Sequence, residues 1–401
     1  MPATFTSPES RFLQIHTLTS FAGVLLNRDD TGAAKRMPYG GAVRTRISSQ
    51  CLKRHWRNAA GEWRLEEEAH KSLRTRHIFE KELHAAVKVQ TNAPDDLIEA
   101  VGNAVTVMLY GKETVKERQA MLFGRPEIDA LKQLSISLVK EAVASGADAK
   151  AAREHAEKQI KESKKNLSAM KDQAGDLPAG LVAALFGRMV TSDPAANTNA
   201  AIHVAHAFTV HREESEGDYF TVVDDLSVAE GEAGSGGIFD TEITSGLFYS
   251  YVVIDVPLLV SNLTGVDATA AFKEGTDRAL PAKIVERLVH LIATVSPGAK
   301  KGSTAPYAYA DLMLIEAGAR QPRSLAAAFR DSVIAGHGQS LAQTAIKAAI
   351  AQLDLFDKAY DRHEARRVMN ATGSDASALG EGLSLNALAT WAAQAVRAGT
   401  A

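Results

Sequence analysis

The sequence of 401 residues contains a single cysteine and no long apolar run. One cysteine, Cys51, excludes an internal disulfide and a zinc module built from several cysteines, and it agrees with a reducing compartment. No segment approaches the roughly 18 consecutive apolar residues of a membrane-spanning helix. Residues 1–16 also lack the basic and then apolar pattern of a secretory leader. We therefore expect a cytoplasmic protein that does not associate with a membrane.

Sequence signatures of nucleotide hydrolysis and of metal binding are missing too. The chain has no GxxxxGK[ST] motif, and the glycines within 231–237 indicate a loop rather than a phosphate cradle. His203 and His206 fall in a segment with strand character. Side chains three positions apart on a strand point to opposite faces, so these two cannot hold one ion. We expect no cofactor and no metal.

Charge is nearly balanced over the whole chain but not along it. The 45 basic and 48 acidic residues give a net charge of -3, in a composition typical of a soluble globular protein. Within residues 28–57, however, eight basic residues oppose two acidic ones, so this stretch carries +6 and the rest of the chain -9. Any preference for a polyanion must come from such a local concentration of charge.

The basic stretch ends in SSQCLKRHWR, which predicts a short helix. Either serine can cap the amides at its start, and Leu52 and Trp56, spaced i, i+4, form its apolar side. Lys53 and Arg57 have the same spacing and share a second face. An amide-rich helix start beside Arg, Lys, Ser and Gln is a set of groups that binds phosphates. The alternative interpretation is a solvated basic loop.

The remaining segments alternate between strand and helix character. A loop is expected at 20–45, helices are expected at 62–176, 266–295 and 322–367, and strands are expected at 11–18, 180–190, 201–212, 246–256 and the end of 296–318. The thirty or so residues after 212 contain DYFTVVDDL and favour an extended arm with its own short strands. This order predicts an α+β core with a helical insertion near its start and an extended insertion in its middle.

Two acidic pairs keep a different class of function open. Asp29 with Asp30, and Asp224 with Asp225, are candidate ligands of a metal-dependent nuclease. Neighbouring carboxylates diverge in extended backbone, and no third acidic residue stands at a converging spacing. A nuclease therefore has weaker support in the sequence than a phosphate-binding helix start.

The aromatic residues of the arm also have two interpretations. Tyr219, Phe220 and Thr221 either contact unstacked bases or form a small hydrophobic anchor. A purely structural subunit that never touches nucleic acid is a third hypothesis for the whole chain. It predicts that the purified protein carries no RNA.

Seven segments occur in an order that resembles a known family. They run from about residue 12 to about residue 315 and read LLNRDDTGAAKR, YGGAVRTRISSQCLKRHWR, FGRMVTS, AIHVAHAFTVH, DYFTVVDDL, SGLFYSYVVIDV and VSPGAKK. In them the chain resembles the CasC family, the crRNA-binding backbone subunit of the type I-E CRISPR Cascade complex. The segments at 60–176 and after residue 320 are similar only in character.

The resemblance implies a hand-shaped, non-catalytic protein that polymerises along a guide RNA and presents it for pairing in antiviral defence. Its partners would be crRNA, neighbouring copies of itself, other Cascade subunits and, through guide pairing, target DNA. The implied parts are an RRM-like (ferredoxin-like) palm at 12–57, 180–215 and 245–345, helical fingers at 58–179, a β-hairpin thumb at 216–244 and a C-terminal helical segment at 346–401.

The resemblance also implies a set of RNA-binding residues. The first six would grip the guide backbone, and the seventh, a methionine, would abut the bases. The next three, in the thumb, would act at kinks of the guide, and the last two, both lysines, are weaker candidates for a phosphate contact. In that order they are Arg28, Lys35, Ser48, Gln50, Lys53, Arg57, Met189, Tyr219, Phe220, Thr221, Lys300 and Lys301. Ala42 and Val43 stand where some relatives are more basic, so we expect a weaker grip at that corner. Contacts of this kind leave the base edges free for pairing.

Overall fold

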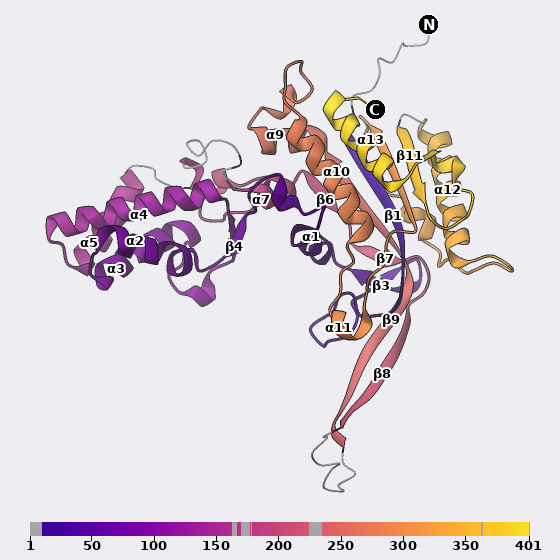
Figure 1. The fold of residues 1–401 in the computed structure, drawn as a ribbon, viewed down its shortest axis with the longest axis horizontal. Helices are drawn as coiled ribbons and strands as arrows, with labels where there is room; N and C mark the ends of the chain where they lie inside the picture. The colour runs from indigo at the N-terminus through magenta and orange to yellow at the C-terminus, as the bar shows by residue number, and fades with distance from the viewer. Residues whose placement is uncertain are drawn as a thin grey trace. The chain divides into compact units, whose positions relative to one another are not determined.

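The computed structural model describes residues 10–162, 167–169, 177, 179–223, 235–361 and 364–400. They form two compact units (Figure 1). The first unit consists of Met1–Arg64, His203–Ile254 and Ala282–Ala401, and the second of Leu65–Ile202 and Asp255–Pro281. Each unit is assembled from segments that are distant in the sequence.

A large, mostly antiparallel sheet dominates the first unit. Among the described residues it has ten strands, in the order β12-β11-β10-β1-β9-β7-β3-β2, with β6 and β8 also paired to β9. The α+β class expected from the sequence is confirmed. The strands are β1 (Phe12–Val24), β2 (Arg36–Tyr39), β3 (Ala42–Ile47), β6 (Ile202–Val204), β7 (Ala207–Thr209), β8 (Glu214–Val223), β9 (Ser235–Asp255), β10 (Leu312–Gly318), β11 (Ala365–Asn370) and β12 (Glu381–Gly382).

Helices cover both faces of this sheet. All seven residues of β10 are buried, which requires that both faces be covered because successive side chains of a strand alternate between faces. On one face Leu314 packs in a cluster with Ile346 and Leu353 of α12 (Leu341–Tyr360). α13 (Leu385–Ala398) contacts β10 and β11, and Figure 1 shows it on the other side of the sheet from α12. Among the described residues, the other helices on this side of the chain are α1 (Ser49–Arg57), α10 (Ala279–Thr294) and α11 (Lys301–Thr304).

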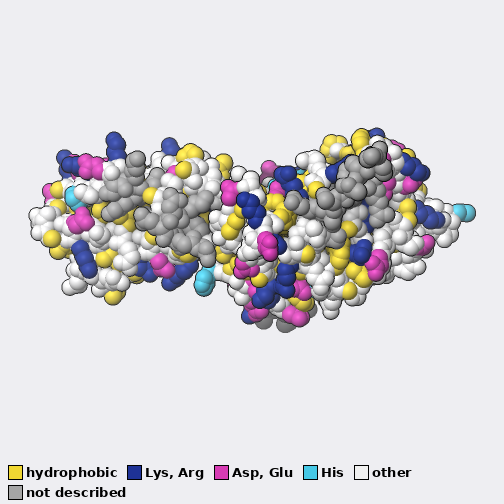
Figure 2. All heavy atoms as spheres, turned by 90° about the horizontal axis from the view of Figure 1, so that it is seen from above, with side chains coloured by type: hydrophobic (Ala, Val, Ile, Leu, Met, Phe, Trp, Pro, Cys, Tyr) yellow, Lys and Arg dark blue, Asp and Glu magenta, His cyan; other side chains and the backbone are white. Residues whose placement is uncertain are grey.

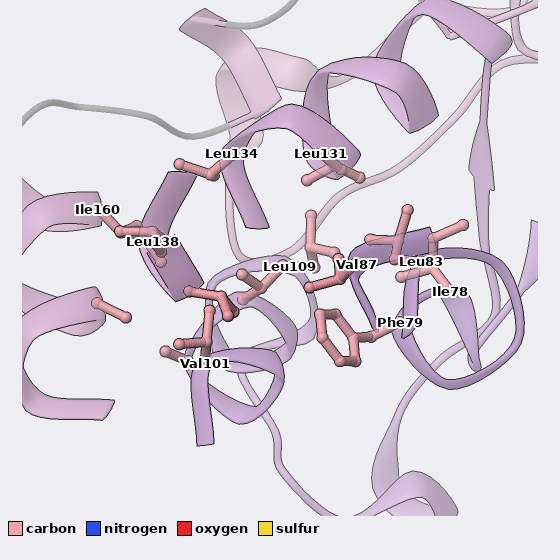
Figure 3. Close-up of a cluster of buried hydrophobic side chains, with 14 of the residues drawn as sticks. Ile78, Phe79, Leu83, Val87, Val101, Leu109, Leu131, Leu134, Leu138 and Ile160 are labelled. Atoms are coloured by element: carbon pink, nitrogen blue, oxygen red, sulfur yellow. The ribbon is translucent and has the colours of Figure 1, made fainter. Parts of the chain in front are cut away.

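The second unit is mainly helical. Its core is a cluster of leucine, isoleucine, valine and phenylalanine side chains that point toward one another from several helices (Figure 3). Gly102 is essential to it, since a Cβ there would lie 2.2 Å from the ring of Phe79. The elements of this unit are α2 (His84–Thr91), α3 (Asp95–Tyr110), α4 (Arg125–Ser145), α5 (Ala149–Glu162), α7 (Leu181–Phe186), α9 (Val256–Thr264) and the strand pair β4 (Leu73–Thr75) and β5 (Met121–Phe123).

The arm expected in the middle of the chain is a β-hairpin. β8 and β9 pair in antiparallel register from Glu214 with Ser245 to Val222 with Gly237, and Figure 1 shows both strands extending beyond the rest of the sheet. Residues 224–234, which include Asp224 and Asp225, lie outside the described residues.

Two predicted elements are wrong. Residues 180–190, expected as a strand, contain the helix α7, because a short run in which Leu181–Leu185 are all buried has no periodicity that distinguishes the two structures. The loop expected at 20–45 contains the end of β1 and the hairpin β2–β3. Gly40 and Gly41, with φ of 59° and 75°, supply its two-residue turn.

The two compact units also differ from the parts that the resemblance implies. Residues 180–202 and 255–281 belong to the helical unit rather than with the sheet. The segment 346–401 is not purely helical, because it contributes β11, which pairs with β10. Within the described ranges, none of the helices combines the length and the apolar character that a membrane span needs.

Candidate nucleic-acid interface

The predicted helix start is present as α1. Ser48 is its N-cap, with φ -68° and ψ 146°, and its hydroxyl oxygen accepts a hydrogen bond of 3.3 Å from the amide of Cys51. Leu52 and Trp56 are buried, as their spacing predicted, while Gln50 is exposed in the first turn. The prediction of a capped, one-sided helix at this place is confirmed.

Asn27 joins the basic loop to the start of α1. Its side-chain Oδ1 accepts a hydrogen bond of 2.9 Å from the amide of Ser48, and its carbonyl accepts one of 2.9 Å from the amide of Lys35. Arg28 and Ala34 form a β-bridge that closes the loop between them. The loop and the N-cap, which are about twenty residues apart in the sequence, are thereby held side by side.

The Asp29 side chain accepts hydrogen bonds from other residues of this loop. Its Oδ1 accepts hydrogen bonds of 2.9 Å from the amide of Thr31 and 2.7 Å from its hydroxyl, and one of 3.1 Å from the amide of Ala33. The hydroxyl of Thr31 is the main cause of a lowered pKa of the Asp29 carboxyl. This carboxylate therefore shapes the loop that carries Arg28 and Lys35.

Four basic side chains gather beside the helix start. Arg46 of β3 donates from Nη1 to Nδ1 of His206, at 3.2 Å. Burial lowers the pKa of His206, and the nearby charges of Arg46, Lys35 and Lys53 lower it further. Three cations, from a loop, a strand and a helix, thus lie within electrostatic reach of one histidine in the turn before β7. Sequence reasoning missed Arg46 and His206, because only the pairing of β3 with β7 brings them together.

Two other arginines of the basic stretch have structural contacts. Arg44 is fully buried and donates to the carbonyl of Thr209 at 2.9 Å and to that of Phe329 at 3.1 Å. Arg36 is paired with Glu213 and Glu242. The local excess of positive charge read from the sequence is therefore only partly available to a ligand.

The hairpin carries aromatic residues near its middle. Phe220 of β8 stacks on Phe239 of β9, with ring centroids 5.5 Å apart, and Tyr219 points to the other face with 64% of its surface exposed. Lys300 reaches this pair from outside the hairpin. Its ammonium lies 5.5 Å from the centroid of Phe220 and donates to the hydroxyl of Thr241.

The other candidate residues lie in different surroundings. Thr221 is exposed on β8. Lys301 is exposed on α11 and lines a cleft of about 460 Å³ beside the C-terminal end of α1. Arg57 occupies the last turn of α1. Met189 belongs to the second unit and is 67% exposed. The structure thus brings Lys35, Ser48 and Lys53 together.

Met189 has a rigid support in its own unit. The preceding residue, Arg188, is buried and pairs with the buried Glu127 at 2.7 Å. Arg188 also donates to the carbonyl of Leu122 at 3.1 Å and to that of Ala196 at 2.8 Å. A flexible thioether held out from such an anchored backbone is suited to contact with apolar faces such as those of bases.

One face of the molecule carries charge of both signs. On the face drawn in Figure 2, basic and acidic side chains are interspersed rather than segregated. Among the described residues there is also no group of three or more His, Cys, Asp or Glu side chains placed to share a metal ion.

The chain belongs to the CT1975-like protein family, which matches residues 13–394. A solved structure described as "CRISPR RNA-guided surveillance complex, pre-nicking" contains a chain 26% identical to this one. That match has a TM-score of 0.71 and covers 95% of this chain and 100% of the other. A chain of a "CRISPR RNA-guided surveillance complex", 22% identical, shares the fold, with a TM-score of 0.65 over 95% of this chain and 99% of the other. None of the curated proteins matches the chain.

Proposed function

We propose that this protein is a non-catalytic subunit of a CRISPR RNA-guided surveillance complex, where it binds the guide RNA and polymerises along it as the backbone of a type I-E Cascade. Its site of action is then the cytoplasm. Other Cascade subunits and neighbouring copies of the chain are its protein partners. Target DNA is contacted through the guide, by base pairing.

The observation that carries this proposal is the cluster of cations at the capped start of α1. Lys35, Arg46 and Lys53 lie around the uncharged His206, close to a helix N-terminus whose amides and dipole favour an anion. The guide must be held whatever its sequence, so its contacts should go to phosphate and sugar. A protein that read bases would instead place bidentate side chains against base edges.

The hairpin supports the same role. An extended β-ribbon with an exposed tyrosine and a phenylalanine pair can lie across a single strand and contact unstacked bases. We assign the cationic cluster to the phosphates and the hairpin to the bases. Family membership and the likeness to a chain of a surveillance complex support the CRISPR context of this assignment.

The nuclease hypothesis has less support. Asp29 is occupied by three hydrogen bonds within its own loop, so it is poorly placed to hold a catalytic metal. Incubation of the purified protein with RNA and magnesium tests this directly. Cleavage that is lost in Asp29→Asn or Asp30→Asn would overturn the assignment of a non-catalytic subunit.

Copurification of RNA tests the proposal as a whole. The protein is expressed with a CRISPR array and its partner subunits, and the nucleic acid that copurifies is measured by the absorbance ratio at 260 and 280 nm and sequenced. We expect array-derived guides of uniform length with many different spacers. A complex free of RNA, or one containing RNA unrelated to the array, contradicts the proposal.

A further inference from the structure

The end of α1 opposite its N-cap borders a cleft of about 460 Å³. Its walls come from the last turn of α1, the residues after α10 and the loop that carries α11. The volume falls within the range of roughly 300–1,000 Å³ that small-molecule sites occupy. A helix of nine residues is only about 14 Å long, so a short single strand can reach from one end of α1 to the other.

The lining of the cleft has cations and no carboxylates among the described residues. Arg54 and Lys301 contribute the positive charges, and both are exposed. His55 donates from Nδ1 to the carbonyl of Cys51 at 2.8 Å, which leaves Nε2 of its neutral ring as an acceptor. Burial lowers the pKa of His55, and the charges of Lys301 and Arg54 add to that effect. An anion with hydrogen-bonding groups suits this lining.

Tyr307 contributes an exposed aromatic ring to the cleft. It is 75% exposed, yet the backbone around it is fixed. The hydroxyl of Ser296 donates to the carbonyl of Ala308 at 2.8 Å and accepts from its amide at 2.9 Å, which closes the loop. Ala305 has a φ of 40°, a left-handed conformation that is unfavourable for alanine and marks a constrained turn. Because the backbone is fixed, a planar partner that binds the exposed ring has only the side-chain rotations of Tyr307 to order.

We propose that this cleft binds one nucleotide, with its base stacked on Tyr307 and its phosphate between Arg54 and Lys301. The inference deepens the proposed function, on which it rests, by adding a second contact with single-stranded nucleic acid. Inorganic anions alone would leave the tyrosine without a role. A nucleotide uses the ring, the two cations and the acceptor of His55 together.

A second cleft of the same unit lacks this character. It has a volume of about 600 Å³ and contains Arg320 and Arg323, but Asp357, Asp361 and Glu364 line it as well. Arg323 is also paired with the buried Glu316, at 2.6 Å. Carboxylates beside the arginines disfavour a phosphate, so the cleft at α1 is the better nucleotide site.

Photocrosslinking of the assembled complex tests the proposal. One arm uses guides with 4-thiouridine placed at successive positions, and the other uses free 8-azidoadenosine 5′-monophosphate added to the guide-loaded complex. Adducts are located by mass spectrometry. Lys301→Gln removes a cation outside α1, and Tyr309→Ala is the matched control, because Tyr309 is 73% exposed on the same loop but does not line the cleft.

We expect an adduct on Tyr307 from the guide, with a yield that falls about tenfold in Lys301→Gln and is unchanged in Tyr309→Ala. An adduct from the azido nucleotide alone identifies a free nucleotide as the ligand and also supports the proposal. If neither probe labels Tyr307 above the level of Tyr309, the nucleotide site is refuted. If the site is refuted but the samples still retain the guide, the proposed function stands. If the azido nucleotide labels Tyr307 but the samples retain no guide, the nucleotide site stands and the proposed function is refuted.

Discussion

Asn27 accepts a hydrogen bond of 2.9 Å from the backbone amide of Ser48. This bond fixes Ser48, the residue that caps α1, to the segment that follows β1. The carbonyl of the same asparagine accepts from the amide of Lys35, so one residue sets the position of both the helix start and the basic loop. The two parts of the candidate phosphate site therefore depend on each other.

Asn27→Ala should weaken both the fold and RNA binding. The amide of Ser48 loses its acceptor, which should lower the free energy of unfolding by about 1 kcal/mol in urea denaturation. RNA retention should fall as well, since Lys35 is no longer held beside the helix start. Asn27→Asp keeps the acceptor, so we expect near-normal stability together with weaker RNA binding from the added negative charge. Equal stability and equal retention in the wild type and Asn27→Ala would contradict this role.

Lys300 should hold the hairpin rather than grip RNA directly. Lys300→Gln removes the ammonium from the face of Phe220 and weakens the bond to Thr241, a loss of about 0.5–1 kcal/mol. Hydrogen exchange of the β8 and β9 amides should accelerate in this variant before RNA is added. Lys301→Gln, one residue further along, should leave the hairpin exchange unchanged. Identical exchange in both variants would show that Lys300 does not brace the hairpin.

Stability should fall on acidification because of a buried network around Glu316. Burial raises the pKa of its carboxyl, but hydrogen bonds from His16 and Arg323 outweigh that effect and lower it overall. A carboxyl with a lowered pKa in the folded state contributes stability above its unfolded pKa of about 4.3, and this is lost as the pH falls.

His16 also lowers the stability of the fold on acidification, in a higher pH range than Glu316. It is buried, and burial lowers its pKa, so below pH 6.5 the unfolded chain takes up a proton that the folded chain excludes. Each such proton gives a slope of about 1.4 kcal/mol per pH unit. Urea denaturation between pH 7.5 and 3 should show a continuous decline, and His16→Gln should make the decline near pH 6 less steep. A flat profile between pH 7 and 5 in the wild type would contradict the neutral state of His16.

Substitution of Met189 should lower RNA affinity without changing stability, whereas substitution of Glu127 should lower stability. Met189→Ala should change the free energy of unfolding by no more than about 0.5 kcal/mol, because its side chain is exposed. Glu127→Ala leaves Arg188 buried without its carboxylate and should cost about 3–5 kcal/mol. If the methionine contacts bases, only Met189→Ala lowers RNA affinity in a fully folded protein. Wild-type RNA affinity in folded Met189→Ala would remove it from the interface.

Local patterns allowed the prediction of α1, whereas non-local pairing decides its surroundings. A serine cap and two i, i+4 pairs are contained within ten residues, so the sequence predicts the helix and its two faces. Arg46 and His206 meet only because β3 pairs with β7 across some 160 residues. Charge counting could not separate Arg44, which is buried against carbonyl groups, from basic residues that face solvent. The helix α7 was missed for a related reason, since its burial comes from the tertiary fold and hides any helical period.

The most direct test of the account is the double variant Lys53→Ala with Arg57→Ala, compared with a control in which the exposed Arg330 and Lys347 are replaced by alanine. RNA binding is measured for several unrelated guide sequences over a range of salt concentrations. We predict that the α1 substitutions weaken all guides alike and reduce the slope of log affinity against log salt by about one for each phosphate that is no longer bound, while the control leaves both unchanged. Unchanged binding, or a loss confined to certain guide sequences, would contradict a grip on the phosphate backbone along α1.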